Sequence, residues 1–169
     1  MANNNIQMAF AAINKEWDEI IPQLIETDGT KDYVLYGKDN QYPEYLYALY
    51  NDVSTLKTVI EGTSDYVIGD EIKCNIKGFE SEVNTKGDTL RELVRLCARD
   101  YLLYGGYGIQ VIRNKVGDVR ELYYMDFRYI RSSKKNDVFW YSEDFSKKYV
   151  RGNKTVVYPK YIPSAKDVA

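Results

Sequence analysis

The run Gly105-Gly106-Tyr107-Gly108 separates a helical pattern from a strand pattern. Before it, Thr89-x-x-Glu92 is typical of a capping box at the start of a helix. After it, strands are predicted at 109–113 and 119–125, joined by a hairpin loop at 114–118. A capped helix that leads into antiparallel strands predicts an α+β fold, with the sheet beside the helices. The apolar face expected for this helix consists of Leu90, Leu93, Val94, Cys97, Tyr101 and Tyr104.

Two further helices are predicted upstream. Pro43 suits the first turn of a helix that runs to about Tyr50, where Asn51-Asp52 should break it. Ser54 is expected to cap the next helix, which ends at Gly69. The apolar face predicted for that helix consists of Leu56, Val59, Ile60, Thr63 and Val67.

The remaining segments alternate between strand and turn signals. Ile72, Cys74 and Ile76 predict a short strand over 71–77, and residues 84–87 predict a turn. A further strand pair is expected at 138–142 and 148–157. N-terminal helices followed by a mainly antiparallel sheet therefore make up one domain over residues 34–169.

Residues 1–33 are predicted to form an N-terminal arm. Trp17, Ile20, Ile21 and Leu24 fit one helical face, but Pro22 predicts a break or only a short helix. The arm fits either packing on a neighbouring subunit or a frayed terminus.

Charge and aromatic content both suit an interaction protein. Residues 1–71 hold 13 acidic and 4 basic side chains, net −9, whereas residues 72–169 hold 12 acidic and 19 basic, net +7. Such asymmetry fits an interaction arm or head-to-tail docking of identical subunits, although charge balance within one fold explains it equally. The 17 tyrosines likewise suit either large interfaces or half-exposed strands.

The composition removes most routes to catalysis. The chain has no histidine, which excludes Ser-His and Cys-His chemistry and the commonest metal ligand. The Gly105–Gly108 run follows a helix, whereas a nucleotide-binding loop follows a strand. Asp65, Asp70 and Glu71 lack the calcium-loop spacing. We therefore expect no enzyme, and no catalytic residue, metal or cofactor.

Other features of the composition concern redox state and membranes. Without a secretory signal, Cys74 and Cys97 are expected to be reduced and buried. No apolar run approaches the roughly 20 residues of a membrane span, so no membrane association is expected.

Three arginines recur at a spacing of four on the predicted third helix. Arg91, Arg95 and Arg99 repel one another slightly and should have a compensating partner. That partner is nucleic-acid phosphate, an acidic patch on a neighbouring subunit, or only water. The three residues are therefore candidates for subunit or DNA contacts.

Four segments, in this order, resemble the N-terminal wing region of tailed-bacteriophage portal proteins. They are Tyr36–Asn51, Ser64–Ile72, Arg99–Gly108 and Glu121–Arg131, and the resemblance extends from about Tyr33 to Tyr161. The first two segments carry the family-like residues Tyr36, Gly37, Asn40, Tyr42, Pro43, Asp65, Tyr66 and Gly69.

This resemblance implies a structural virion protein. Portal proteins form a ring of identical subunits, usually a dodecamer, at one capsid vertex. Double-stranded DNA passes through the ring, which contacts the terminase and the capsid and tail proteins. The location implied is the virion, and the host cytoplasm during assembly. Portal proteins are much longer, so the chain is expected to be an N-terminal fragment.

The alternative is a small nucleic-acid-binding module. Basic residues after position 112 are interleaved with aromatic ones, as in proteins that bind single strands. Acidic residues dilute this surface. The basic residues concerned are Arg113, Lys115, Arg120, Arg128, Arg131, Lys134, Lys135, Lys147, Lys148 and Arg151.

Overall fold

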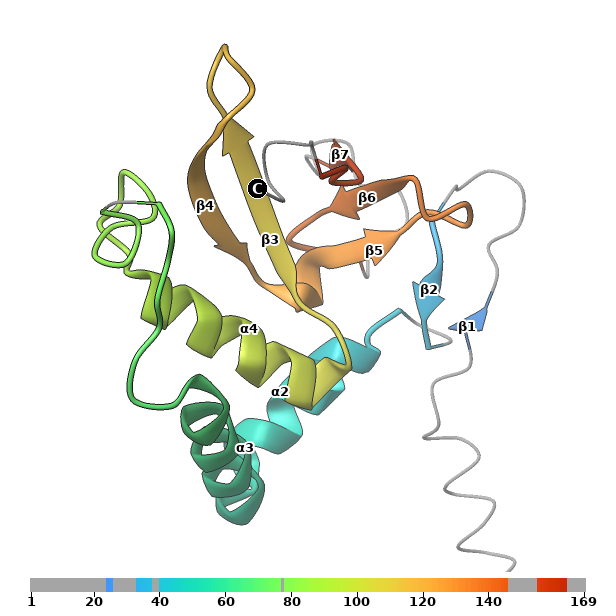
Figure 1. The fold of residues 1–169 in the computed structure, drawn as a ribbon. Coiled ribbons are helices and arrows are strands. Elements are labelled where there is room, and N and C mark those ends of the chain that lie inside the picture. Colours follow the sequence, from blue (N-terminus) through green and yellow to red (C-terminus); the bar gives the residue numbers. More distant parts are fainter. Residues whose placement is uncertain (1–23, 26–32, 38–39, 77, 146–154, 164–169) are drawn as a thin grey trace, which may run out of the picture.

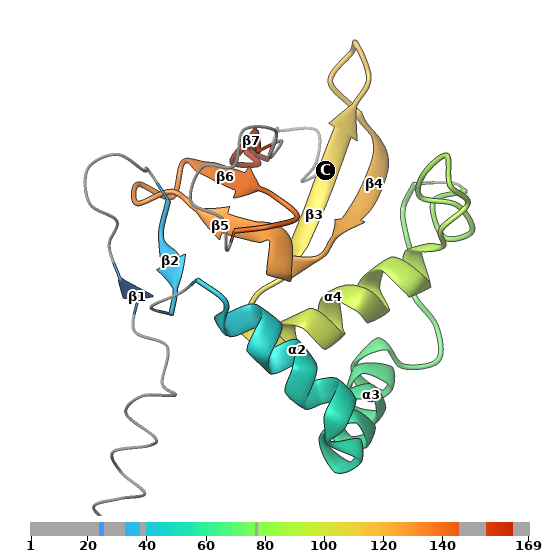
Figure 2. The same ribbon diagram turned by 180° about the vertical axis from the view of Figure 1, so that it is seen from behind.

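The computed structural model describes residues 24–25, 33–37, 40–76, 78–145 and 155–163 (Figure 1). Within these residues, a short antiparallel strand pair is followed by three helices and then by further antiparallel strands, which confirms the predicted α+β class. Figure 2 shows the same arrangement from behind, with the helices on one side and the strands on the other. The elements are β1 (Leu24–Ile25), β2 (Leu35–Tyr36), α2 (Tyr42–Asp52), α3 (Ser54–Ile68), α4 (Leu90–Tyr104), β3 (Gly108–Arg113), β4 (Val119–Met125), β5 (Ile130–Ser132), β6 (Val138–Tyr141) and β7 (Val156–Pro159).

The first two helices differ from the prediction at their shared boundary. Pro43 does lie in the first turn of α2, but the helix continues through Asn51 and Asp52 instead of breaking there. The Asn51 side chain donates to the backbone oxygen of Tyr47, which ties it into the helix. The break falls at Val53, whose extended backbone begins α3, and Ser54 makes no capping hydrogen bond.

The buried face of α3 is rotated from the predicted one. Ile60, Ser64 and Ile68 are buried, whereas Val59 and Val67 are exposed. Ser64 can occupy the interface because its hydroxyl donates to the Ile60 backbone oxygen, which satisfies the buried polar group. Gly69 ends the helix, as predicted.

The third helix begins with the predicted capping box. The Thr89 side chain accepts from the Glu92 backbone N–H, and the Glu92 carboxylate accepts from Thr89. Tyr101, assigned to the buried face by its spacing, is exposed, and Asp100 is buried instead. The core lies between this helix and the β3–β4 hairpin and includes Phe79, Val83, Leu93 and Cys97, with Ile109, Leu122 and Tyr124 packed against them.

The strand predicted at 71–77 is wrong for the described residues 71–76, none of which is in a strand. The Cys74 backbone N–H donates to the Glu80 side chain instead of to a neighbouring strand. The alternating apolar residues of this segment therefore do not belong to a sheet. The predicted turn at 84–87 is present, with a hydrogen bond from Gly87 to Asn84. Both cysteines are free, but only Cys97 is buried.

The strands form a hairpin and a separate three-stranded sheet. β3 and β4 pair antiparallel across the predicted loop, with Gly108 opposite Met125. The second sheet has the order β5–β6–β7, also antiparallel. β5 was not predicted, because three residues with Arg131 at the centre give no alternating signal. β7 begins at Val156, well after the predicted residue 148, although 148–154 lie outside the described residues.

The predicted arm lies mostly outside the described residues. Leu24, expected on a helical face, is instead in β1, which pairs with β2. Trp17, Ile20 and Ile21 are not described. Tyr33 is buried and packs its ring against Trp140, so this end of the predicted arm lies against the three-stranded sheet.

Candidate functional site

Two residues that carry the resemblance, Tyr36 and Asn40, form a buried joint with Arg131. Asn40 is buried with a positive φ of 62°, a conformation that asparagine tolerates better than most residues. Its Oδ1 accepts from the Tyr36 backbone N–H at 2.9 Å and from Arg131 Nε at 2.6 Å. The Gly37 backbone oxygen accepts from Asn40 N–H, which closes the turn. Arg131 therefore holds this turn, hereafter the anchored turn, in place before α2.

Arg131 reaches this joint from a position 91 residues further along the chain than Asn40. Its side chain lies between the Tyr36 and Phe145 rings, at 4.8 and 4.5 Å from their centroids. Its remaining N–H groups donate to the backbone oxygens of Asn40, Arg128 and Ile130. Burial lowers the pKa of Arg131 to about 10. The guanidinium is held by neutral oxygens and aromatic faces, so this arginine is 1% exposed and has no surface to offer nucleic acid.

A second arginine, Arg128, ties α2 to the strand layer. It pairs with Asp126, with the shortest contact at 2.6 Å, and lies 3.8 Å from the Tyr47 ring centroid. A hydrogen bond from this arginine to Asp126 raises its pKa above the usual value. Two of the basic residues in the predicted nucleic-acid surface thus serve the fold of this chain.

The arginine stripe on α4 contacts three different places in the chain. Arg95 binds Asp65 at 2.8 Å and Glu61 at 2.5 Å on α3, and the Asp65 bond is the largest cause that raises the pKa of Arg95. Arg91 donates to the backbone oxygen of Asp70. The mutual repulsion of the stripe is therefore compensated within the chain, a partner that the sequence alternatives did not include.

Arg99, the third member, belongs to a buried polar network. Its Nη2 donates to Asp100 at 2.9 Å and to the Tyr124 hydroxyl at 2.9 Å, and that hydroxyl donates to Asp100 at 2.6 Å. The Phe127 backbone N–H also donates to Asp100. Burial raises the pKa of Asp100, and these donors oppose that effect. Asp100 is 0% exposed, so the network holds α4 against β4 with no access for a substrate.

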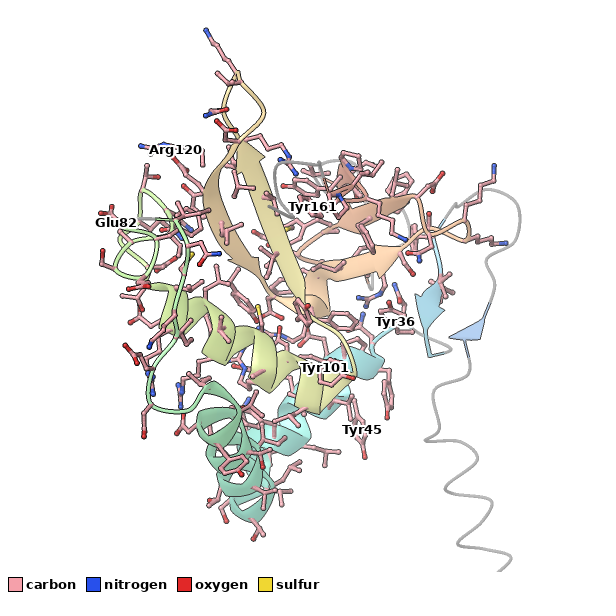
Figure 3. The ribbon with its side chains drawn as sticks, in the orientation of Figure 1. Tyr36, Tyr45, Glu82, Tyr101, Arg120 and Tyr161 are labelled. Carbon is pink, nitrogen blue, oxygen red and sulfur yellow. The ribbon has the colours of Figure 1, made fainter. Side chains whose placement is uncertain are left out.

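The Asp65-Tyr66-Val67 segment at the end of α3 behaves differently from the anchored turn. Tyr66 is 88% exposed and Val67 62%, although both lie in a helix that packs its other face on α4. Val59 lies about two turns earlier and is exposed too. Tyr45 on α2 and Tyr101 on α4 add exposed rings at the helical layer (Figure 3). Exposed apolar side chains therefore lie on all three helices of this layer.

Asp65, Asp70 and Glu71 are not brought together as a metal site. In the ranges that the structure describes, no group of three potential ligands among His, Cys, Asp and Glu gathers. Asp65 is engaged by Arg95, and Glu71 pairs with Lys73 at the surface. No described helix is long and apolar enough to span a membrane.

A cleft of about 410 Å³ lies between the β3–β4 hairpin and the β5–β6–β7 sheet. Strand register places Phe139 opposite Tyr158 and Ile130 opposite Tyr141, and all four line the cleft. Gln110 lines it from β3, while Tyr161 lies between hairpin and sheet (Figure 3). The charged residues that line it, Arg113 and Lys160, are both basic.

Sequence reasoning did not find this cleft. Its walls come from strands whose mutual placement depends on contacts far apart in the chain. One signal was present: aromatic residues recur through 127–161, a pattern that also fits sheet faces or a nucleic-acid surface. Apolar clefts with a few polar groups are the usual form of ligand sites.

Comparisons with known proteins add no assignment. No family model matches the chain, and neither a curated protein nor a solved structure matches it.

Proposed function

We propose that this chain is the N-terminal, wing-like part of a ring-forming portal protein of a tailed bacteriophage. Support comes from the order of segments that resemble that family. The Tyr36–Asn51 segment supplies the anchored turn and most of α2, Ser64–Ile72 includes the end of α3, and Arg99–Gly108 spans the junction of α4 with β3. A portal subunit works by self-association and passage of DNA, so the role requires no catalytic group.

The observation that carries the proposal is the exposure of Tyr66 and Val67. Both lie in the family-like Asp65–Gly69 segment, yet neither packs in the core of this chain. Tyrosine buries a large apolar ring and keeps a polar tip, which suits it to subunit interfaces. We infer that this end of α3 contacts a neighbouring subunit in the ring. Arg91, Arg95 and Arg99 remain predicted contacts.

The proposal is tested on a version extended to the natural end of its gene, by negative-stain electron microscopy. Rings with a central hole are expected for the unaltered protein. Tyr66→Ser combined with Val67→Ser should abolish the rings or require at least tenfold higher protein concentration, because apolar contact area is lost. Thr58→Ala, on another side of α3, is the matched control and should leave the rings intact.

The outcomes separate clearly. A full-length protein that stays monomeric overturns the portal proposal. Rings that tolerate the double serine variant retain the portal role and remove this end of α3 from the interface. Salt-dependent DNA binding by a monomeric protein would instead support the nucleic-acid module, because phosphate contacts release counterions.

A further inference from the structure

We propose that the cleft between the hairpin and the three-stranded sheet binds the acidic segment 16–21 of a second copy of this chain. The inference deepens the proposed function by naming a contact between subunits. It rests on that function because both require the chain to self-associate. The cleft supplies three properties that such a segment needs: an apolar floor, a strand edge and a basic rim.

The apolar floor comes from the sheet face that carries Ile130, Phe139 and Tyr158. One end of the cleft is closed, because a Cβ added at Gly108 would lie only 2.2 Å from Ile130 Cδ1. Toward the other end, the Arg113 guanidinium lies 5.1 Å from the Tyr161 ring centroid. The volume of about 410 Å³ is enough for several side chains and small for a folded domain.

The strand edge is that of β3. Among the described strands, β3 pairs only with β4, and Figure 1 shows its other side toward the three-stranded sheet. Residues 108–111 of this strand line the cleft one after another. A strand edge beside an apolar floor is the arrangement that captures an extended peptide, through main-chain hydrogen bonds and alternate side-chain pockets.

The charges select an acidic occupant. Both charged residues that line the cleft are basic. Residues 16–21 read Glu-Trp-Asp-Glu-Ile-Ile, which combines three carboxylates with three large apolar side chains. Residues 1–71 carry net −9 and residues 72–169 net +7, so the two halves of neighbouring copies attract each other. An oligonucleotide is the other anion that would suit an aromatic cleft. Binding of an oligonucleotide would not explain why residues 1–71 are acidic.

The position of β1 favours a neighbouring copy as the donor. Segment 16–21 precedes β1, which lies beyond the three-stranded sheet from the hairpin in both views (Figures 1 and 2). The cleft lies on the hairpin side of that sheet. Docking of one copy's acidic segment into the next copy's cleft is a head-to-tail contact, the kind that closes into a ring.

The test uses the full 169-residue chain and sedimentation equilibrium. The unaltered chain should self-associate. The segment variant, Trp17→Ala with Ile21→Ala, should raise the dissociation constant at least tenfold by removing the apolar anchors. The cleft variant, Gln110→Glu, should do the same, because it is nearly isosteric and places a carboxylate against an acidic segment. Gln110→Lys is the matched control and should not weaken association.

Mixing the two variants distinguishes exchange between copies from any indirect effect. Each variant alone should self-associate at least tenfold more weakly than the unaltered chain, whereas a 1:1 mixture should form heterodimers, since one chain supplies an intact cleft and the other an intact segment. Circular dichroism checks that each variant is folded. An unaltered chain that is monomeric, or a mixture that does not associate, overturns the inference.

Two further readouts complete the design. A fluorescent thymidine 20-mer probes the other occupant: if Gln110→Glu abolishes its binding while self-association persists, the cleft belongs to single-stranded nucleic acid and the inference fails. Electron microscopy of the extended protein separates this inference from the proposed function. If the extended protein with the segment variant still forms rings, the proposed function stands and the role of the segment is overturned. If the 1:1 mixture associates but the extended protein forms no rings, the segment's role stands and the proposed function is overturned.

Discussion

At the scale of single residues, the chain relies on buried polar side chains that hydrogen-bond across the fold. Arg131 and Asn40 are 91 positions apart and make the joint that anchors the turn before α2. Asp100 plays the same part between α4 and β4. A buried polar group that loses its partner costs the full price of its desolvation, so these contacts should be sensitive to small changes.

Asn40→Ala should destabilise the chain by about 2–3 kcal/mol, because Arg131 Nε and the Tyr36 N–H lose an acceptor and alanine tolerates the positive φ poorly. Urea unfolding measures the change. Asn40→Asp keeps the accepting oxygen and should cost clearly less. Equal losses in the two variants would contradict the role given to Oδ1.

At the scale of elements, the junction of α4 with β3 decides how closely the two strand layers approach. Gly105 ends the helix in the left-handed conformation. Gly108 then lies so near Ile130 and the Met125 backbone oxygen that a side chain has no room. The Gly105–Gly108 run therefore serves close packing at a helix-to-strand junction.

Gly108→Ala should destabilise the chain by about 1–3 kcal/mol, since the added methyl group must displace Ile130 or the β4 backbone. Gly62→Ala is the matched substitution inside α3, where a Cβ meets nothing within 4 Å. It should be neutral or stabilise by up to about 1 kcal/mol through helix propensity. Thermal unfolding of both variants checks the opposite signs.

At the scale of the whole molecule, ionisable groups that are neutral at pH 7 are buried across the helical and strand layers. Burial raises the pKa of Cys97 to about 12, and burial with a hydrogen bond to Glu61 raises that of Tyr50 to about 12. Burial also raises the pKa of Tyr104 and Tyr124. The folded chain keeps these protons at a pH where the unfolded chain releases them.

The stabilisation that these groups provide should therefore be complete below about pH 9. Above it, the free energy of unfolding should fall as the pH rises toward 12. Each such group contributes a slope of about 1.4 kcal/mol per pH unit in this window. Between pH 9 and 11, Cys97→Ala should make this fall less steep by about 1.4 kcal/mol per pH unit, the contribution of one group. The cavity left by the substitution also lowers the free energy of unfolding, but by an amount that does not change with pH. Urea unfolding at stepped pH measures it, and an unchanged slope would refute the assignment.

Local patterns in the sequence determined the α+β class, the capping box of α4, the glycine ends of two helices and the β3–β4 hairpin. These features depend on neighbours a few residues apart, so propensity and spacing predict them. The prediction was wrong where a pattern lacked a pairing strand, as in the described residues 71–76. It was also wrong where packing of another element determined the buried face, as for Tyr101 and Val59.

Only the tertiary structure decided what the polar and aromatic residues do. Arg131 and Arg128 have the same sequence signature as a nucleic-acid surface. Contacts with distant residues nevertheless bury Arg131 and place Arg128 against the Tyr47 ring on α2. The cleft exists because the β3–β4 hairpin and the three-stranded sheet, which approach closely at Gly108 and Ile130, both supply its walls. Long-range packing carries no local signal, since its free energy depends on which surfaces the completed fold brings together.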